Sequence, residues 1–121
     1  AIEEAVVRWL PSVSTPGDTV FVYFSGHAGQ YETSDPSEPD GQDEALCPYD
    51  LTAGSTTDPP DVRRNKARDS SILDDTLARW LQELTGRQVV LIVDTCHSGG
   101  LIAGKGVSAR RWANEATRAK D

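Results

Sequence analysis

The sequence predicts an α/β fold, in which a mostly parallel sheet is flanked by helices. Residues 19–25 and 88–93 are two apolar runs of strand length, and residues 71–85 between them have the periodicity of a helix. A strand, a crossover helix and a second strand make a right-handed unit with both strands parallel. Neither run alternates polar with apolar residues, which indicates strands covered on both faces. The 121 residues are enough for one modest domain.

The chain opens with a predicted helix over residues 2–10, where apolar residues recur at helical spacing. Pro11 is expected to end this helix, because a proline ring fits poorly in a helix interior. The turn residues 15–18, Thr-Pro-Gly-Asp, then lead into the first strand.

The chain changes character after the first strand. Residues 31–61 hold nine acids and five of the seven prolines but no lysine or arginine, so this window is expected to be mostly loop. Residues 63–68, RRNKAR, then supply four bases. We interpret residues 31–69 as a long acidic and basic loop insertion, and we favour an ordinary solvated surface as the explanation of both charge runs.

The helix over residues 71–85 has the clearest pattern. Ser71 can serve as its N-cap with Asp74 at the third helical position, and Gly86 fits the position just past its end. Its apolar stripe comprises Leu73, Leu77, Trp80, Leu81 and Leu84.

Composition narrows the choice of partners and compartment. A net charge of −7 argues against nucleic acid, since phosphate binding needs a basic face. We expect no membrane span, because no apolar run approaches ~20 residues, and we see no secretory signal. Two cysteines make no disulfide framework, which favours a reducing, cytoplasmic compartment. The chain begins at Ala1 and contains no methionine, so we expect a piece of a larger protein.

Reactive side chains follow both predicted strands. His27 and Cys96 come shortly after the first and second strand, where the carboxyl ends of parallel strands share one ligand-binding edge. Neighbouring strands are ~4.8 Å apart, so adjacent strands would let thiol and imidazole face one another. A free cysteine alone is commonly a small apolar core residue. A thiol beside an imidazole instead suits nucleophilic acyl transfer, with thiolate attacking and imidazole moving the proton.

Four sequence blocks, in this order, resemble those of the caspase-like cysteine peptidases and specifically of their metacaspase branch, bacterial relatives included. They are FSGHAGQ (24–30), DGQDEALCPYD (40–50), ILDDTL (72–77) and DTCHSGG (94–100). The last block differs from the caspase motif Q-A-C-[RQG]-G at its first and fourth positions. The resemblance implies a caspase-like fold, with residues 1–121 as part of one peptidase domain. This large-subunit region would lack the first strand and the C-terminal small-subunit part.

The resemblance also implies a role for each matching residue in a cysteine endopeptidase. Cys96 would be the nucleophile and His27 the general acid and base. The backbone N–H groups of Ala28 and Cys96 would form the oxyanion hole, although the family usually has glycine at the position of Ala28. Asp94 would line the primary pocket and select Arg or Lys before the scissile bond. Asp94 could instead be a strand-end acid that accepts turn N–H bonds.

Calcium is the one cofactor that the resemblance suggests, because some family members require it. The matching carboxylates are Asp43, Asp74 and Asp75, all hard oxygen ligands. Two features weigh against calcium: Asp74 already suits a helix cap, and residues 100–106 contain no carboxylate where the family has a further acid. No other cofactor is expected.

The resemblance further implies a protein or peptide substrate and activation by proteolysis. Residues 101–121 would be a basic junction where activating cleavage occurs, and the remaining C-terminal part of the same protein would be the second chain. The basic residues of this junction are Lys105, Arg110, Arg111, Arg118 and Lys120.

Two other functions remain open at this point. The same fold could be a catalytically silent scaffold or interaction subunit with an active partner. A zinc site could use His27, Cys47, Cys96 and His97, although the spacing of structural zinc sites is missing. Otherwise we interpret Cys47 as a packing residue and His97 as a residue that shapes its loop.

Overall fold

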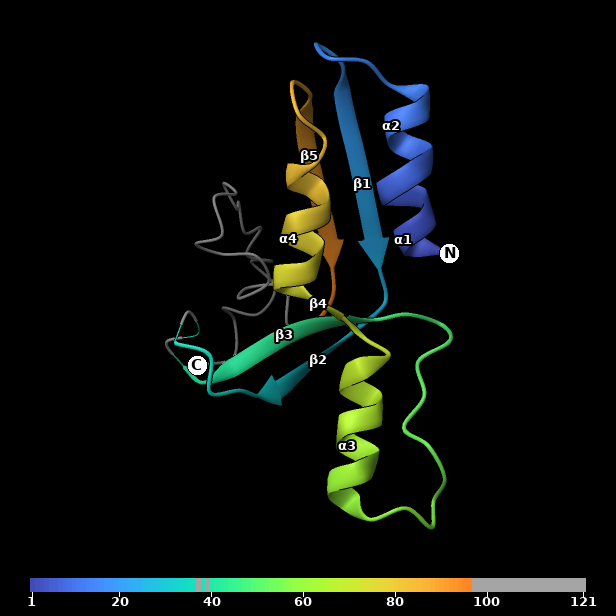
Figure 1. Cartoon of the computed structure of the whole chain (residues 1–121), viewed down its shortest axis with the longest axis vertical. Coiled ribbons are helices and arrows are strands. Elements are labelled where there is room, and N and C mark those ends of the chain that lie inside the picture. Colours follow the sequence, from blue (N-terminus) through green and yellow to red (C-terminus); the bar gives the residue numbers. More distant parts are fainter. Residues whose placement is uncertain (37, 39, 97–121) are drawn as a thin grey trace, which may run out of the picture.

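The computed structural model describes residues 1–36, 38 and 40–96 (Figure 1). Two parallel strands lie at its centre, β1 (Thr19–Ser25) and β5 (Gln88–Asp94). Their register pairs Thr19 with Gln88 at one end and Ser25 with Asp94 at the other. The chain passes between them through helix α4 (Asp74–Gln82), which lies beside β5 in Figure 1. The parallel α/β unit predicted from the sequence is therefore confirmed.

The core lies between one face of this strand pair and two helices. Val20 of β1 is buried against side chains of α4, and Val6 of the N-terminal helix belongs to the same cluster. Burial of such apolar side chains is the dominant favourable term in folding. It fixes the two strands and so fixes the positions of the residues that follow their carboxyl ends. The α4 members of the cluster are Leu77, Ala78 and Leu81.

The N-terminal helix runs past Pro11, so the predicted end at that residue is wrong. Proline removes one N–H and crowds the carbonyl four residues earlier in a regular α-helix. A π-helical segment directly precedes Pro11, and this change of hydrogen-bond pattern accommodates the ring. The helix ends at Val13, because the backbone of the following Ser14 is extended. Its parts are α1 (Ile2–Glu4), η1 (Ala5–Trp9) and α2 (Leu10–Val13).

A second, antiparallel sheet follows β1. Strand β2 (His27–Glu32) pairs with β3 (Gln42–Cys47), and the two-residue strand β4 (Ile72–Leu73) pairs with the other side of β3. Helix α3 (Pro60–Asp69) precedes β4. In Figure 1 this sheet crosses below the carboxyl ends of β1 and β5, and α3 lies below the sheet.

The prediction that residues 31–69 are mostly loop is wrong for β3 and α3. Strand β3 carries two acids, Asp43 and Glu44, that are only 4% and 5% exposed. Asp43 is tolerated there because the Nη2 of Arg68, on α3, lies 2.8 Å from its carboxylate. An ion pair between residues 25 positions apart leaves no periodic signal in the sequence.

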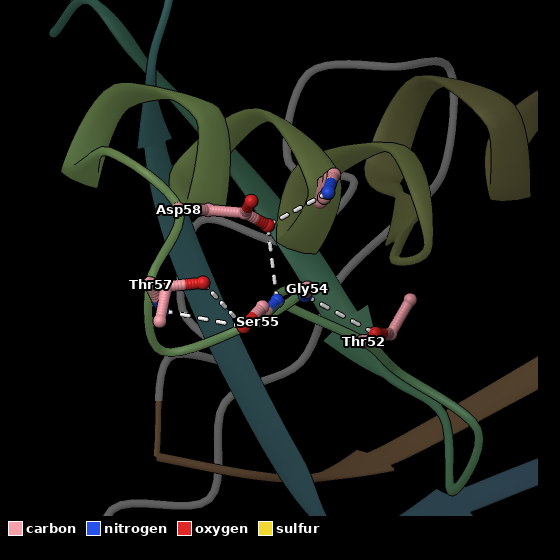
Figure 2. A network of polar contacts seen from close by, with 6 residues as sticks. Thr52, Gly54, Ser55, Thr57 and Asp58 are labelled. Carbon is pink, nitrogen blue, oxygen red and sulfur yellow. Dashed lines mark hydrogen bonds and ion pairs between the residues drawn. The ribbon is translucent and has the colours of Figure 1, made fainter.

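The loop between β3 and α3 is fastened to the helix through Asp58 (Figure 2). The Asp58 carboxylate accepts the Ser55 backbone N–H at 2.9 Å and the Lys66 ammonium at 2.7 Å. The Lys66 hydrogen bond is the main cause that lowers the pKa of Asp58, followed by the Ser55 bond. Gly54 has φ +74°, which favours glycine, and a Cβ there would lie 2.5 Å from this carboxylate, so a larger residue would have to displace the Asp58 side chain. These contacts fasten residues 54–58 to α3.

Helix α4 begins later than predicted. Ser71 is not its N-cap, because Ile72 and Leu73 pair with β3 before the helix starts at Asp74. The Ser71 hydroxyl instead donates to the Ala67 carbonyl at 2.8 Å and lies 2.9 Å from the Tyr31 hydroxyl. Pairing with a distant strand has overridden the local helix signal.

The second face of the β1–β5 pair is open in the part of the chain that the structure describes. Phe21, Tyr23 and Ile92 are 66%, 63% and 47% exposed. The prediction that both faces of these strands are covered is therefore wrong at Phe21, Tyr23 and Ile92. Exposed apolar side chains gathered on one sheet face mark a surface for further packing. None of the described helices is long and apolar enough to cross a membrane.

Candidate active site

The register of β1 and β5 places His27 and Cys96 at matching positions. Ser25 is the Cα partner of Asp94, and each candidate residue lies two positions further along its own chain. The Gly26 N–H donates to the Asp94 carbonyl at 3.2 Å, which continues the pairing beyond the last strand residues. His27 and Cys96 therefore emerge together from the carboxyl ends of two adjacent strands, and both are exposed.

The Cys96 thiol contacts the first residues of β2. Its Sγ donates a hydrogen bond to the Ala28 carbonyl oxygen at 3.8 Å, a distance typical of weak bonds from sulfur. This contact joins the loop after β5 to the strand that begins with His27. The thiol of Cys96 thus lies next to Ala28, the residue that directly follows His27.

Ala28 presents its backbone to the side of β2 that faces away from β3. The Thr33 N–H donates to the Gly41 carbonyl at 3.0 Å, so the odd-numbered residues of β2 bond to β3. Bonded and non-bonded positions alternate in an antiparallel ladder, and both polar groups of one residue point the same way. The N–H and carbonyl of Ala28 consequently point to the outer edge of β2, where Cys96 lies.

Asp94 is the last residue of β5 and is exposed. It lies beside Ser25, on the strand side of Cys96, and its backbone carbonyl accepts the Gly26 N–H. The strand ends at Asp94, because the chain bends at Thr95 and turns at Cys96. Asp94 and Cys96 are therefore separated by a single bend residue.

Cys47 lies closer to the site than its interpretation as a packing residue suggested. It is half-buried, and its Cα partner in the β2–β3 pairing is His27. Burial raises the pKa of Cys47, and the negative charge of a Cys96 thiolate raises it further. The two free thiols are thus within electrostatic range of each other. The sequence carries no signal for this, because it depends on the hairpin register.

A carboxylate cluster lies apart from the two thiols. Oxygens of Glu38, Asp43 and Asp74 lie within 4.8 Å of one another, and Asp74 is fully buried. The structure therefore groups two of the three predicted calcium ligands and adds Glu38, which the sequence analysis missed. The third, Asp75, is not a member, and its N–H donates to the Asp74 carboxylate at 2.8 Å.

The carboxylate oxygens of this cluster suit a hard cation, and one of the carboxylates is also paired with an arginine. Carboxylate oxygens are what calcium prefers, but Arg68 already lies 2.8 Å from Asp43 and neutralises one member. In the described chain no other group of acids, cysteines and histidines comes together in this way. His27, Cys47 and Cys96 therefore form no zinc site there, while His97 and residues 101–121 lie outside the described residues.

Comparisons with known proteins agree with these sequence blocks. The family model for "Metacaspase, peptidase C14 domain" matches residues 2–104. Metacaspase-1A of Neurospora crassa is 34% identical over 97 residues, which are 79% of this chain and 18% of that protein. Metacaspase-1 of Cryptococcus neoformans is 35% identical over 96 residues, 78% of this chain and 19% of that protein. The chain spans less than a quarter of the length of these relatives.

The two thiols are expected to react at different rates with iodoacetamide at neutral pH. Cys96 is exposed, whereas the raised pKa of Cys47 leaves little of its thiolate to react. Timed alkylation followed by peptide mass spectrometry gives both rates. In Cys96→Ala the pH midpoint for Cys47 alkylation should fall, because one of the two causes of its raised pKa is gone. An unchanged midpoint would show that the two thiols are not neighbours.

Proposed function

This chain belongs to the metacaspase family, and we propose that the complete protein is a cysteine endopeptidase with a Cys96–His27 dyad. The observation that most supports the proposal is the register of β1 and β5, because His27 and Cys96 each lie two residues beyond the paired Ser25 and Asp94 at one sheet edge. The Cys96 thiolate attacks the scissile carbonyl carbon. His27 accepts the thiol proton and returns it to the leaving amine, after which water hydrolyses the acyl-enzyme.

The oxyanion of the tetrahedral intermediate is proposed to bind the N–H groups of Ala28 and Cys96. Support comes from the outward orientation of the Ala28 backbone, which is directed to the edge that the Cys96 thiol contacts. No positive φ occurs at Ala28, since this residue lies within strand β2. The alanine methyl group therefore leaves the backbone donor in place. Removing one such donor typically costs about 100-fold or more in kcat.

Asp94 is proposed to select a basic side chain before the scissile bond. Asp94 is exposed and lies two residues before the proposed nucleophile, at the carboxyl end of β5. A carboxylate binds the arginine guanidinium through two parallel hydrogen bonds and lysine through one point charge. We therefore propose that the protein cleaves after Arg or Lys, with Arg preferred.

The rest of the same protein is proposed to complete the domain as a second chain. The open sheet face with Phe21, Tyr23 and Ile92 supports this proposal, because it offers apolar side chains for packing. Cleavage after the basic residues within 101–121 is proposed to separate the chains and activate the enzyme. A reducing, cytoplasmic location is also proposed, in keeping with two free cysteines.

Calcium is proposed to bind at the carboxylate cluster of Glu38, Asp43 and Asp74. When bound, the ion would supply positive charge that neutralises acids buried beside β3 and α4. Asp43 would then either bind the ion and Arg68 at the same time or give up its ion pair with Arg68. The cluster joins β3 to the start of α4, so its state of charge affects how firmly the hairpin that carries His27 is held.

Cleavage assays on the complete protein test the proposed activity. The substrates are peptides that end in Arg, Lys or Asp before a fluorogenic amine. The Arg peptide should be hydrolysed fastest, the Lys peptide more slowly and the Asp peptide hardly at all. Cys96→Ala should lose activity to background, while Cys47→Ala should retain most of it. Asp94→Asn should lower kcat/KM for Arg peptides by about 100-fold, because a charge-assisted pair worth about 1.5–3 kcal/mol is lost.

Each outcome of these assays decides one assignment. Preference for Asp would overturn the role of Asp94, and full activity of Cys96→Ala would falsify the nucleophile. A well-folded protein without activity on any of these peptides would favour the silent scaffold.

Calcium titration by calorimetry tests the carboxylate cluster. Glu38→Gln should weaken binding about tenfold, since one ligand charge is lost, whereas Asp75→Asn should change it less than threefold. Both variants remove one negative charge, but only Glu38 belongs to the cluster. Equal effects of both variants, or no calcium binding by the unmodified protein, would contradict the assignment of this cluster.

A further inference from the structure

Strand β2 has a free edge that begins at the nucleophile. The order of the antiparallel sheet is β2-β3-β4, so within residues 1–36, 38 and 40–96 only one side of β2 is paired. The alternation fixed by the Thr33–Gly41 bond directs the backbone groups of Ala28, Gln30 and Glu32 to the unpaired side. The first of these residues contacts the Cys96 thiol. A row of unpaired donors and acceptors therefore leads away from the reacting atoms.

The direction of this edge relates it to one side of the substrate. Asp94 lies on the strand side of Cys96, beside Ser25, whereas Gln30 and Glu32 lie beyond Ala28 on the other side. A basic side chain held at Asp94 belongs to the residue before the scissile bond. The residues after that bond consequently extend toward Gln30 and Glu32, and they run in the same direction as β2.

We propose that the substrate residues after the scissile bond add to the free edge of β2 as a parallel strand. The proposal rests on the proposed peptidase function, because the site of the scissile bond is inferred from Cys96 and Asp94. Extended peptides commonly bind by adding a strand to an exposed sheet edge, with main-chain hydrogen bonds giving affinity. Here the edge is continuous with the catalytic centre, which makes the substrate its occupant.

A hollow at the far end of β2 gives this edge a side-chain subsite. It has a volume of about 290 Å³ and is lined by Gln30, Tyr31, Glu32, Gln42 and Arg64. From Ala28 to Glu32 the strand rises about 13 Å, so the hollow receives a side chain about four residues after the cleaved bond. We call this the distal subsite.

The distal subsite carries one charge of each sign. Arg64 on α3 and Glu32 on β2 lie 4.0 Å apart, and their side chains are 63% and 81% exposed. An exposed pair at this distance contributes little by itself. Either member can therefore pair with a charged side chain of the substrate. Arg64 favours an acidic residue there, and Glu32 favours a basic one.

Backbone N-methylation of the substrate tests the strand pairing directly. A quenched fluorescent peptide with one Arg is made in four forms, each with a single N-methyl group at the second to fifth residue after the scissile bond. The unmodified complete protein should show an alternating pattern, with kcat/KM about fivefold lower at every other position and less than twofold lower between. Equal losses at all four positions, or none, would overturn the proposal.

Charge reversal tests the distal subsite. In Arg64→Glu, the ratio of kcat/KM for peptides with Lys against Glu at the fourth residue after the bond should rise about fivefold. Arg63→Glu is the matched control, because Arg63 is exposed on the same helix but does not line the hollow. Equal shifts in both variants would remove the distal subsite from the proposal.

A third measurement uses the edge of β2 itself. Gln30→Pro removes one outward N–H without removing a β2–β3 bond, and proline is tolerated at such edge positions. It should reduce the advantage in kcat/KM of the extended peptide over an aminocoumarin substrate that ends at the scissile bond. An undiminished advantage would overturn the pairing at Gln30. If this variant does not fold, the N-methyl series on the unmodified protein still decides.

These experiments separate the two proposals. Absence of cleavage of every peptide overturns the peptidase function and the strand pairing together. Cleavage after Arg without an alternating N-methyl pattern overturns the strand pairing alone.

Discussion

The parallel pairing of β1 with β5 determines where every proposed catalytic group lies. Each residue pair of this ladder, up to Ser25 with Asp94, sets the height at which the two chains leave the sheet. A slip by two residues would keep the same faces buried but would move Cys96 about 6.6 Å from its position beside His27. The core behind the strands prevents such a slip only if side chains such as Val20 and Leu77 fit one register.

The antiparallel hairpin places a strand edge with a defined direction next to this aligned pair of residues. Because β2 alternates between bonds to β3 and unpaired groups, its outer edge repeats the same polar pattern from Ala28 to Glu32. At the start of this edge Ala28 contacts the Cys96 thiol, and at its end Glu32 lines the hollow beside Arg64. One strand thus joins the proposed chemistry to the proposed recognition of the residues that follow the cleaved bond.

Burial of charge holds this hairpin against the helices. Asp43 and Asp74 are buried acids, and the nearest cation shown for Asp43 is Arg68. Removing one partner of a buried pair typically costs about 3–5 kcal/mol, because the other charge is left in a low dielectric. Helix α3 therefore does more than cover the sheet, because it supplies the Arg68 guanidinium that pairs with Asp43 of the acidic strand β3.

Local signals in the sequence predicted the parallel unit but not the hairpin. Residues 20–24 and 89–93 are a continuous run of aliphatic and aromatic side chains, so strand length and composition were sufficient there. Strand β3 was not predicted, because it contains acids whose burial depends on Arg68. Ile72 was assigned to the following helix, but it pairs with Leu46 of β3 instead. The places of His27 and Cys96 followed from the strand ends. The neighbourhood of Cys47 and the role of Glu38 depend on contacts between distant segments.

Disulfide trapping of the β1–β5 register tests the central claim most directly. In the complete protein with Cys47 and Cys96 replaced by alanine, Phe21→Cys with Val90→Cys should oxidise rapidly, because these residues are Cα partners at about 4.8 Å. Phe21→Cys with Ile92→Cys should not, because that pair is about 8 Å apart in this register and lies beyond disulfide reach. Rapid oxidation of the second pair in place of the first would show a two-residue shift and would separate Cys96 from His27.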